Sequence, residues 1–173
     1  MPEDTIIDEL YFSLLRVPIL ADIDEKRLYQ VASEATVDFF PTDAVIFRQG
    51  DYSFDFYIVL HGMVRLVMSG PKGEEYLGSL GRNHFFGEMG SLSYLPRTAT
   101  AIAEAPTYLL KVPHELFNEL MDNSPSFKEI IDRQYRERAI YLQLKLSPLF
   151  AELPLEERSE EHTSELQSRQ SIS

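Results

Sequence analysis

The apolar positions of residues 10–31 recur at the three- and four-residue spacing that brings side chains onto one face of a helix. Pro18 interrupts this spacing, and proline inside a helix removes a backbone hydrogen bond. Asp24 precedes the second apolar run and has a side chain that caps helix N-termini well. The sequence therefore predicts a helical N-terminal region that is broken at Pro18 and starts again after Asp24.

From Thr36 the apolar spacing changes to two, which is typical of β-strands with one buried face. His61-Gly62 and the turn at 71–73 separate neighbouring β-rich runs. All eight glycines lie between Gly50 and Gly90, where a compact roll needs its turns. Short, evenly spaced antiparallel strands indicate a jelly-roll-like antiparallel β-barrel. The predicted strands cover 37–39, 45–47, 56–60, 63–68, 76–80, 97–104 and 107–112.

After Val112 the pattern becomes helical again. Pro113 is suited to a helix start, and a helix is predicted over 114–121. A longer helix is predicted from Ser124-Pro125 to about Leu146. The fold class is therefore α+β, mainly β, with an N-terminal helix before the roll and C-terminal helices after it.

Composition narrows the possible functions. The formal net charge of −12 argues against binding of nucleic acid through this chain, because phosphate neutralisation needs an excess of Lys and Arg. No cysteine is present, which excludes disulfides and thiolate chemistry and fits a reducing cytoplasm. The N-terminus is acidic where a signal peptide would be basic, and no apolar run approaches the length that spans a membrane. A cytoplasmic protein without membrane contact is expected.

Residues 86–100 combine the chemistry of an anion site with that of a sugar site. Glycines flank Glu88, and glycine lets backbone amides approach an anion closely at the start of a short helix. Arg97 offers a planar set of donors that suits phosphate. An ionised Glu88 only accepts hydrogen bonds, so a sugar hydroxyl is a natural partner for it. One compact pocket for a phosphate and a sugar is the simplest joint interpretation.

This segment, with Phe-Gly-Glu, a short helix and then Pro-Arg-Thr-Ala-Thr, resembles the phosphate-binding cassette of cyclic nucleotide-binding domains. The resemblance covers roughly residues 10–144. It implies that the protein is no enzyme and needs no cofactor or metal, and that its ligand is cAMP or cGMP. In the family's pattern the carboxylate binds the ribose 2′-OH, the arginine binds the cyclic phosphate, and the threonine lies beside phosphate and base. The ligand-binding residues that it implies are Gly87, Glu88, the amides of Met89 and Gly90, Arg97 and Thr98.

Two features qualify this resemblance. Gly90-Ser91 stands where many family members have Ala-Leu, which makes the short helix less apolar. In the family the last helix often covers the base, and a Tyr or Arg there can stack on a purine. The candidates on that helix are Arg133, Tyr135, Arg136, Arg138 and Tyr141, of which Tyr135 and Tyr141 are the proposed base caps.

Residues 144–153 repeat the pattern of residues 14–23, with identical Leu, Pro and Ala at a constant offset. Similarity between two segments at a fixed spacing indicates an internal repeat. Residues 1–144 are therefore interpreted as the cyclic nucleotide-binding domain, and 145–157 as the start of a truncated second copy. Residues 158–173 resemble the translation of a common short-read sequencing adapter and are excluded from the fold. We expect the natural protein to continue, with an effector or second domain beyond this chain.

Two other functions remain open at this stage. In the first, Glu88 and Arg97 pair with each other in a ligand-free roll that serves dimerisation or docking. In the second, the roll is a metal enzyme of the cupin kind, but His61, His84 and His114 form no His-x-His cluster. The favoured hypothesis is a regulatory cyclic nucleotide sensor that signals through its C-terminal helices to an effector domain or partner protein, with homodimerisation possible.

Overall fold

The computed structural model describes residues 3–147. The N-terminal region forms helix α1 (Glu3–Leu14), a 3-10 turn η1 (Pro18–Leu20) and helix α2 (Glu25–Glu34). The predicted break at Pro18 is confirmed. Asp24 is the N-cap of α2, and its carboxylate accepts a hydrogen bond from the Arg27 amide at 3.0 Å. The hydrogen bond from the Arg27 guanidinium, and after it this backbone hydrogen bond, hold the pKa of Asp24 below its usual value.

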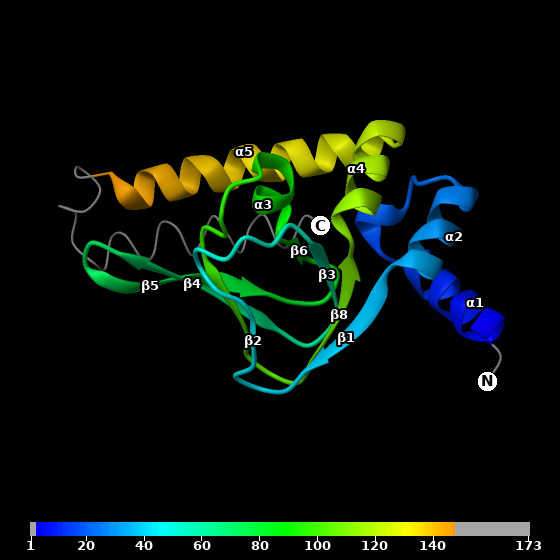
Figure 1. The fold of residues 1–173 in the computed structure, drawn as a ribbon, viewed down its shortest axis with the longest axis horizontal. Helices are drawn as coiled ribbons and strands as arrows, with labels where there is room; N and C mark the ends of the chain where they lie inside the picture. The colour runs from blue at the N-terminus through cyan, green and yellow to red at the C-terminus, as the bar shows by residue number, and fades with distance from the viewer. Residues whose placement is uncertain (1–2, 148–173) are drawn as a thin grey trace.

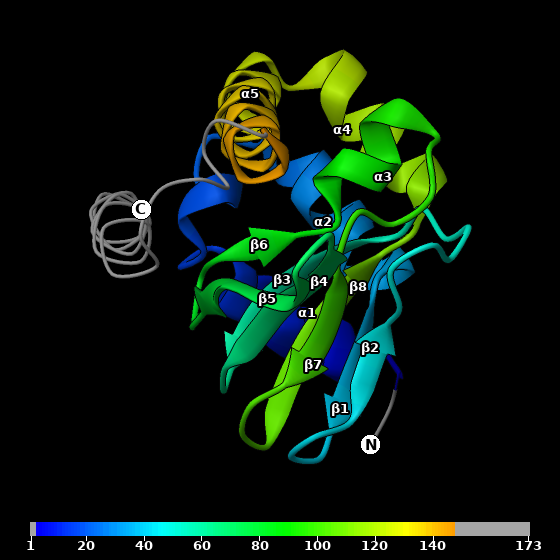
Figure 2. The same ribbon diagram turned by 90° about the vertical axis from the view of Figure 1, so that its left-hand side faces the viewer.

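The strands form two antiparallel four-stranded sheets, with the orders β1-β8-β3-β6 and β2-β7-β4-β5. Figure 2 shows the two sheets below α3, α4 and α5, with α1 behind the strands. The jelly-roll-like antiparallel fold is confirmed, although the described strands do not close into one barrel. The strands are β1 (Thr36–Phe40), β2 (Val45–Phe47), β3 (Phe56–His61), β4 (Val64–Gly70), β5 (Gly73–Leu80), β6 (Phe85–Phe86), β7 (Thr100–Ala103) and β8 (Thr107–Val112).

Two apolar cores follow from the alternation of side chains along the strands. One lies inside the roll and includes Val59, Phe86 and Leu109. The other lies between the β1-β8-β3-β6 sheet and the helices, and it includes Phe56 and Leu110. Because successive strand residues point to opposite faces, Leu109 and Leu110 serve different cores. The middle of β8 is therefore buried on both faces, and the helices pack against this part of the sheet.

The three remaining helices lie over one end of the roll (Figure 1). They are α3 (Glu88–Ser93), α4 (His114–Asn123) and α5 (Pro125–Leu146). The predicted helices after Val112 are thus confirmed, as is the short helix of the cassette. Figure 1 shows that α5 extends past α3 towards the β4–β5 end of the roll. This course brings the last helix over the cassette.

Two sequence interpretations fall largely outside the described residues. Residues 145–147 form the end of α5 and the residue that follows it. The rest of the proposed second copy and the adapter-like residues 158–173 lie beyond the described part, so the domain division stays a prediction. Among residues 3–147 no helix has the length and apolar character needed to cross a membrane.

Candidate functional site

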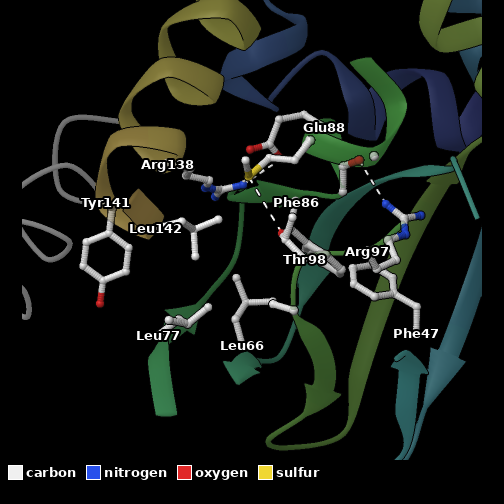
Figure 3. Close-up of a pocket in the computed structure, with 14 residues that line it drawn as sticks. Phe47, Leu66, Leu77, Phe86, Glu88, Arg97, Thr98, Arg138, Tyr141 and Leu142 are labelled. Carbon is white, nitrogen blue, oxygen red and sulfur yellow. Dashed lines mark hydrogen bonds and ion pairs between the residues drawn. The ribbon is translucent and has the colours of Figure 1, made fainter. Parts of the chain in front are cut away.

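A pocket opens between the α3 cassette, the β2-β7-β4-β5 sheet and α5 (Figure 3). The empty space at this site amounts to about 600 Å³, a figure that includes space open to solvent. Its walls combine apolar side chains with a few charged ones. The lining residues are Phe47, Leu66, Leu77, Phe86, Gly87, Glu88, Met89, Gly90, Arg97, Thr98, Ala99, Arg138, Tyr141 and Leu142.

Arg97 is a buried cation in the wall of this pocket, with 3% of its surface exposed. Its Nε donates to Ser53 Oγ at 2.9 Å, Nη1 to the Gly87 carbonyl at 3.0 Å and Nη2 to the Asp55 carbonyl at 2.7 Å. Its guanidinium also lies 4.1 Å from the centre of the Phe47 ring. All of these hydrogen-bond acceptors are neutral, and no carboxylate in the described part of the chain forms an ion pair with Arg97.

Burial lowers the pKa of Arg97, because the charged guanidinium has lost much of its hydration. Nearby ionisable groups partly offset this effect, and Glu88 is one of them. A buried charge without a direct counter-ion is costly, so an anion that reaches it is strongly favoured. The environment of Arg97 would therefore favour a negatively charged group beside the guanidinium.

The backbone at Gly87 and Gly90 lets Arg97 approach the cassette closely. Gly87 is the N-cap of α3 and has φ of 91°, in the left-handed region that favours glycine. A Cβ at Gly87 would lie 2.8 Å from the Asp55 carbonyl oxygen and 3.0 Å from Arg97 Nη1. A Cβ at Gly90 would lie 3.1 Å from Arg97 Nη1. The missing Cβ at both glycines thus leaves room for the Arg97 guanidinium beside the start of α3.

We expect Gly87→Ala to destabilise the fold and to weaken ligand binding together. The left-handed conformation alone costs a non-glycine residue roughly 1–2 kcal/mol, and the contact with the Asp55 carbonyl adds to this. Chemical denaturation measures the first effect and ligand titration the second. Gly50→Ala is the matched control, because Gly50 has φ of 90° but open space where its Cβ would lie. Equal losses of binding in the two variants would contradict the close-contact explanation.

Glu88 is fully buried and pairs with an arginine of the last helix. Arg138 Nη1 lies 2.7 Å from both Oε1 and Oε2 of Glu88, and Nη2 donates to the Phe85 carbonyl at 2.8 Å. This ion pair joins the first turn of α3 to the middle of α5 (Figure 3). The sequence interpretation had named Arg138 only as one of several candidates for stacking on a base.

The alternative in which Glu88 and Arg97 pair with each other is not what the structure contains. Glu88 binds Arg138, and Arg97 binds Ser53 and two backbone carbonyls. Both side chains nonetheless line the same pocket, as Figure 3 shows. Glu88 and Arg97 therefore border one space while each is bonded to other groups.

The structure separates the two tyrosines proposed as base caps. Tyr141 lines the pocket and packs with Met68, Leu77 and Ala99, with 9% of its surface exposed. Tyr135 lies on the same helix but is not among the lining residues. The place of Tyr141 is compatible with capping a base, and its role in binding stays a prediction.

The remaining cassette residues also lie at the pocket. Thr98 is exposed, and its hydroxyl lies 4.0 Å from the Met89 sulfur. The amides of Glu88, Met89 and Gly90 belong to the first turn of α3, where no intrahelical acceptor is available. Ser91, in place of an apolar residue, donates from Oγ to the Phe54 carbonyl at 2.7 Å. This hydrogen bond gives the departure Gly90-Ser91 a physical explanation, because it fixes α3 to the loop before β3.

The pocket thus combines a buried cation, a buried carboxylate and an apolar wall. The sequence model of one protein family, described as "Cyclic nucleotide-binding domain", matches residues 37–124 of this chain. This match covers more than half of the chain, and the chain therefore belongs to the cyclic nucleotide-binding domain family.

Individual proteins support this assignment. The chain is 28% identical over 140 residues to a cAMP-dependent protein kinase regulatory subunit from Schizosaccharomyces pombe, a match that covers 76% of this chain and 33% of that protein. It is 32% identical over 121 residues to lysophospholipase nte1 from Aspergillus oryzae, which covers 69% of this chain and 7% of the relative. The chain thus spans only a minor part of these curated relatives.

A solved structure has the same fold. The regulatory domain of Toxoplasma gondii PKA, crystallised with cAMP, superposes with a TM-score of 0.70 at 25% sequence identity. The superposition covers 78% of this chain and 51% of that one. The β-roll with helices at both ends is therefore shared with a known cAMP-bound domain.

Proposed function

We propose that this domain is a regulatory sensor that binds cAMP or cGMP in the pocket between α3 and α5. The observation that carries the proposal is the buried Arg97, a cation in a pocket wall that has no direct counter-ion among residues 3–147. The cyclic phosphate provides the missing negative charge, and the first-turn amides of α3 add donors. The purine then occupies the opposite part of the pocket, which is lined by the apolar side chains Leu66, Leu77 and Ala99.

The ribose 2′-OH donates to Glu88, and this contact links binding to the last helix. Glu88 already uses both carboxylate oxygens for Arg138. A hydroxyl that donates to the same carboxylate changes the strength of that ion pair and thereby the packing of α5. A ligand shifts a two-state element only through different affinities for the two states, and the Glu88–Arg138 pair is where the two states differ.

The last helix then transmits the change to an effector domain or partner protein. It contacts the roll at Arg138, at Tyr141 and through the ion pair between Lys145 Nζ and Glu75 Oε2 at 3.5 Å. These contacts lie along the part of α5 that covers the pocket. Because a helix moves as a rigid rod over this length, a change at any of these contacts is carried to the end of α5.

A thermal unfolding experiment tests the proposal. A ligand that binds only the native state at a concentration 100 times its Kd stabilises it by about 2.7 kcal/mol. For a domain of this size we expect cAMP or cGMP to raise the unfolding midpoint by roughly 5–10 °C. The linear nucleotide 5′-AMP is the control and is expected to give a much smaller shift.

No shift with cAMP or cGMP at millimolar concentration would contradict the sensor function. Such a result would favour the ligand-free roll that serves dimerisation or docking. Among residues 3–147 no group of three or more His, Asp or Glu side chains could hold a metal ion, so elemental analysis for bound metal addresses the cupin-like alternative separately.

A further inference from the structure

The last helix has a second apolar face that nothing in the described part of the chain covers. Ile140 is 58% exposed and Leu144 is 45% exposed. Residues four apart lie on one face of a helix, so these two side chains are neighbours. Tyr141 and Arg138 occupy a different side of α5 and contact the roll. The helix therefore has one face for this domain and one that lacks a partner here.

The internal repeat indicates what this face is for. When Pro148 is aligned with Pro18, the end of α5 aligns with α1. Tyr141 then matches Tyr11, and Leu144 matches Leu14, as identical residues. Ile140 matches Leu10, a similar aliphatic residue. The sequence similarity thus extends upstream of the proline into residues that the structure describes.

Two of these three matching positions have opposite environments in the two helices, whereas Tyr11 and Tyr141 both pack against a core. In α1, Leu14 is fully buried, and Leu10 and Tyr11 pack against the core between the helices and the sheet. In α5, the matching Leu144 and Ile140 are exposed. Leu10 and Leu14 fix α1 to its own roll. Their counterparts in α5, Ile140 and Leu144, are exposed in the described part of the chain.

We propose that α5 is shared by two rolls, and that its Ile140–Leu144 face docks against a second β-roll of the same family that follows in the natural chain. In that second unit α5 has the place that α1 has in the first. The occupant of the face is thus the sheet of the following roll, in the arrangement by which Leu10 and Leu14 are held in this domain.

In this arrangement the second roll receives the signal of the proposed function. Only this coupling between the first pocket and the second roll rests on nucleotide binding. Arg138 and Tyr141 contact the first pocket, whereas Ile140 and Leu144 contact the second roll. Both pairs lie within two turns of one helix, so a shift of α5 caused by a ligand moves the docking face as well. The docking itself depends on apolar burial and requires no ligand.

The natural reading frame beyond Glu157 gives the first test. The inference requires a second roll there, with a second Phe-Gly-Glu and Pro-Arg pair at the offset that separates Pro148 from Pro18. A frame that continues without such a roll would overturn the inference.

Substitutions in the full-length natural protein give the second test. Leu144→Glu is expected to lower the unfolding midpoint of the second unit, measured by calorimetry without nucleotide, by about 5 °C or more, because a charge then enters a buried apolar contact. Leu146→Glu is the matched control. Leu146 is 53% exposed, and the matching residue, Arg16, is exposed just after the end of α1, so this variant should leave both midpoints unchanged.

Equal effects of Leu144→Glu and Leu146→Glu would overturn the shared helix, because simple exposure would then explain both. A dimer of the full-length protein that Leu144→Glu dissociates, seen by analytical ultracentrifugation, would also overturn it and assign the face to a second copy. These readouts use no cAMP or cGMP, so their failure is distinguishable from a failure of the sensor function.

Discussion

Arg97→Ala is expected to raise the Kd for cAMP or cGMP by roughly 30-fold to several thousand-fold. The reason is the environment of Arg97, which is 3% exposed and whose hydrogen-bond acceptors within the described part of the chain are all neutral. Removal of one partner of a buried, charged hydrogen bond costs about 2–5 kcal/mol, and each 1.4 kcal/mol is about tenfold in affinity. Isothermal titration calorimetry with either nucleotide measures the change directly.

Two controls separate binding from stability at this position. Arg97→Lys keeps the charge but cannot reproduce the three-way contact to Ser53 and the two carbonyls, so an intermediate affinity is expected. Arg48→Ala removes an exposed arginine near the same loop and should leave the affinity within about twofold. An Arg97→Ala protein that is folded by circular dichroism and binds nucleotide as the wild type does would refute the role of Arg97.

Arg138→Ala is expected to destabilise the nucleotide-free protein by about 3–5 kcal/mol. The substitution leaves the fully buried Glu88 carboxylate without its counter-ion, and an unpaired buried charge is the costly outcome of breaking such a pair. It also removes the hydrogen bond to the Phe85 carbonyl. Urea-induced unfolding, followed by circular dichroism, gives the free energy of unfolding for each variant.

The same helix supplies a matched control for this prediction. Arg136→Ala makes the same chemical change at an exposed position two residues earlier and should alter stability by less than about 0.5 kcal/mol. In a Glu88→Gln background, Arg138→Ala should cost far less than in the wild type, because the buried charge is already gone. Additive effects of Glu88→Gln and Arg138→Ala would mean that the ion pair does not hold α5 to the cassette.

The local spacing of apolar residues predicted those helices and strands in which that spacing has a clear period. Strand alternation, the break at Pro18 and the Asp24 cap are each set by residues close together in sequence, and the structure contains them. Strand β6 was missed because its two residues, Phe85 and Phe86, are too few to establish a period. The division into two four-stranded sheets was also not predictable, since pairings such as β1 with β8 join distant segments.

Two charged residues that line the pocket were predictable from the sequence, but their hydrogen-bond and ion-pair partners were not. Glu88 and Arg97 came from one short segment whose residue types and spacing are specific. Their actual partners, Arg138 for Glu88 and Ser53 for Arg97, are far away in sequence and carry no local signal. Only the fold brings the β2–β3 loop and the last helix to the cassette. The protein partners of Glu88 and Arg97 therefore depend on tertiary contacts that the sequence alone does not show.

A crystal structure of the protein with cAMP tests the central claim most directly. We predict that the cyclic phosphate lies within hydrogen-bonding distance of the Arg97 guanidinium and that the ribose 2′-OH donates to Glu88, with the purine towards Tyr141. Nucleotide bound with its phosphate away from Arg97, or bound outside the pocket between α3 and α5, would contradict the account.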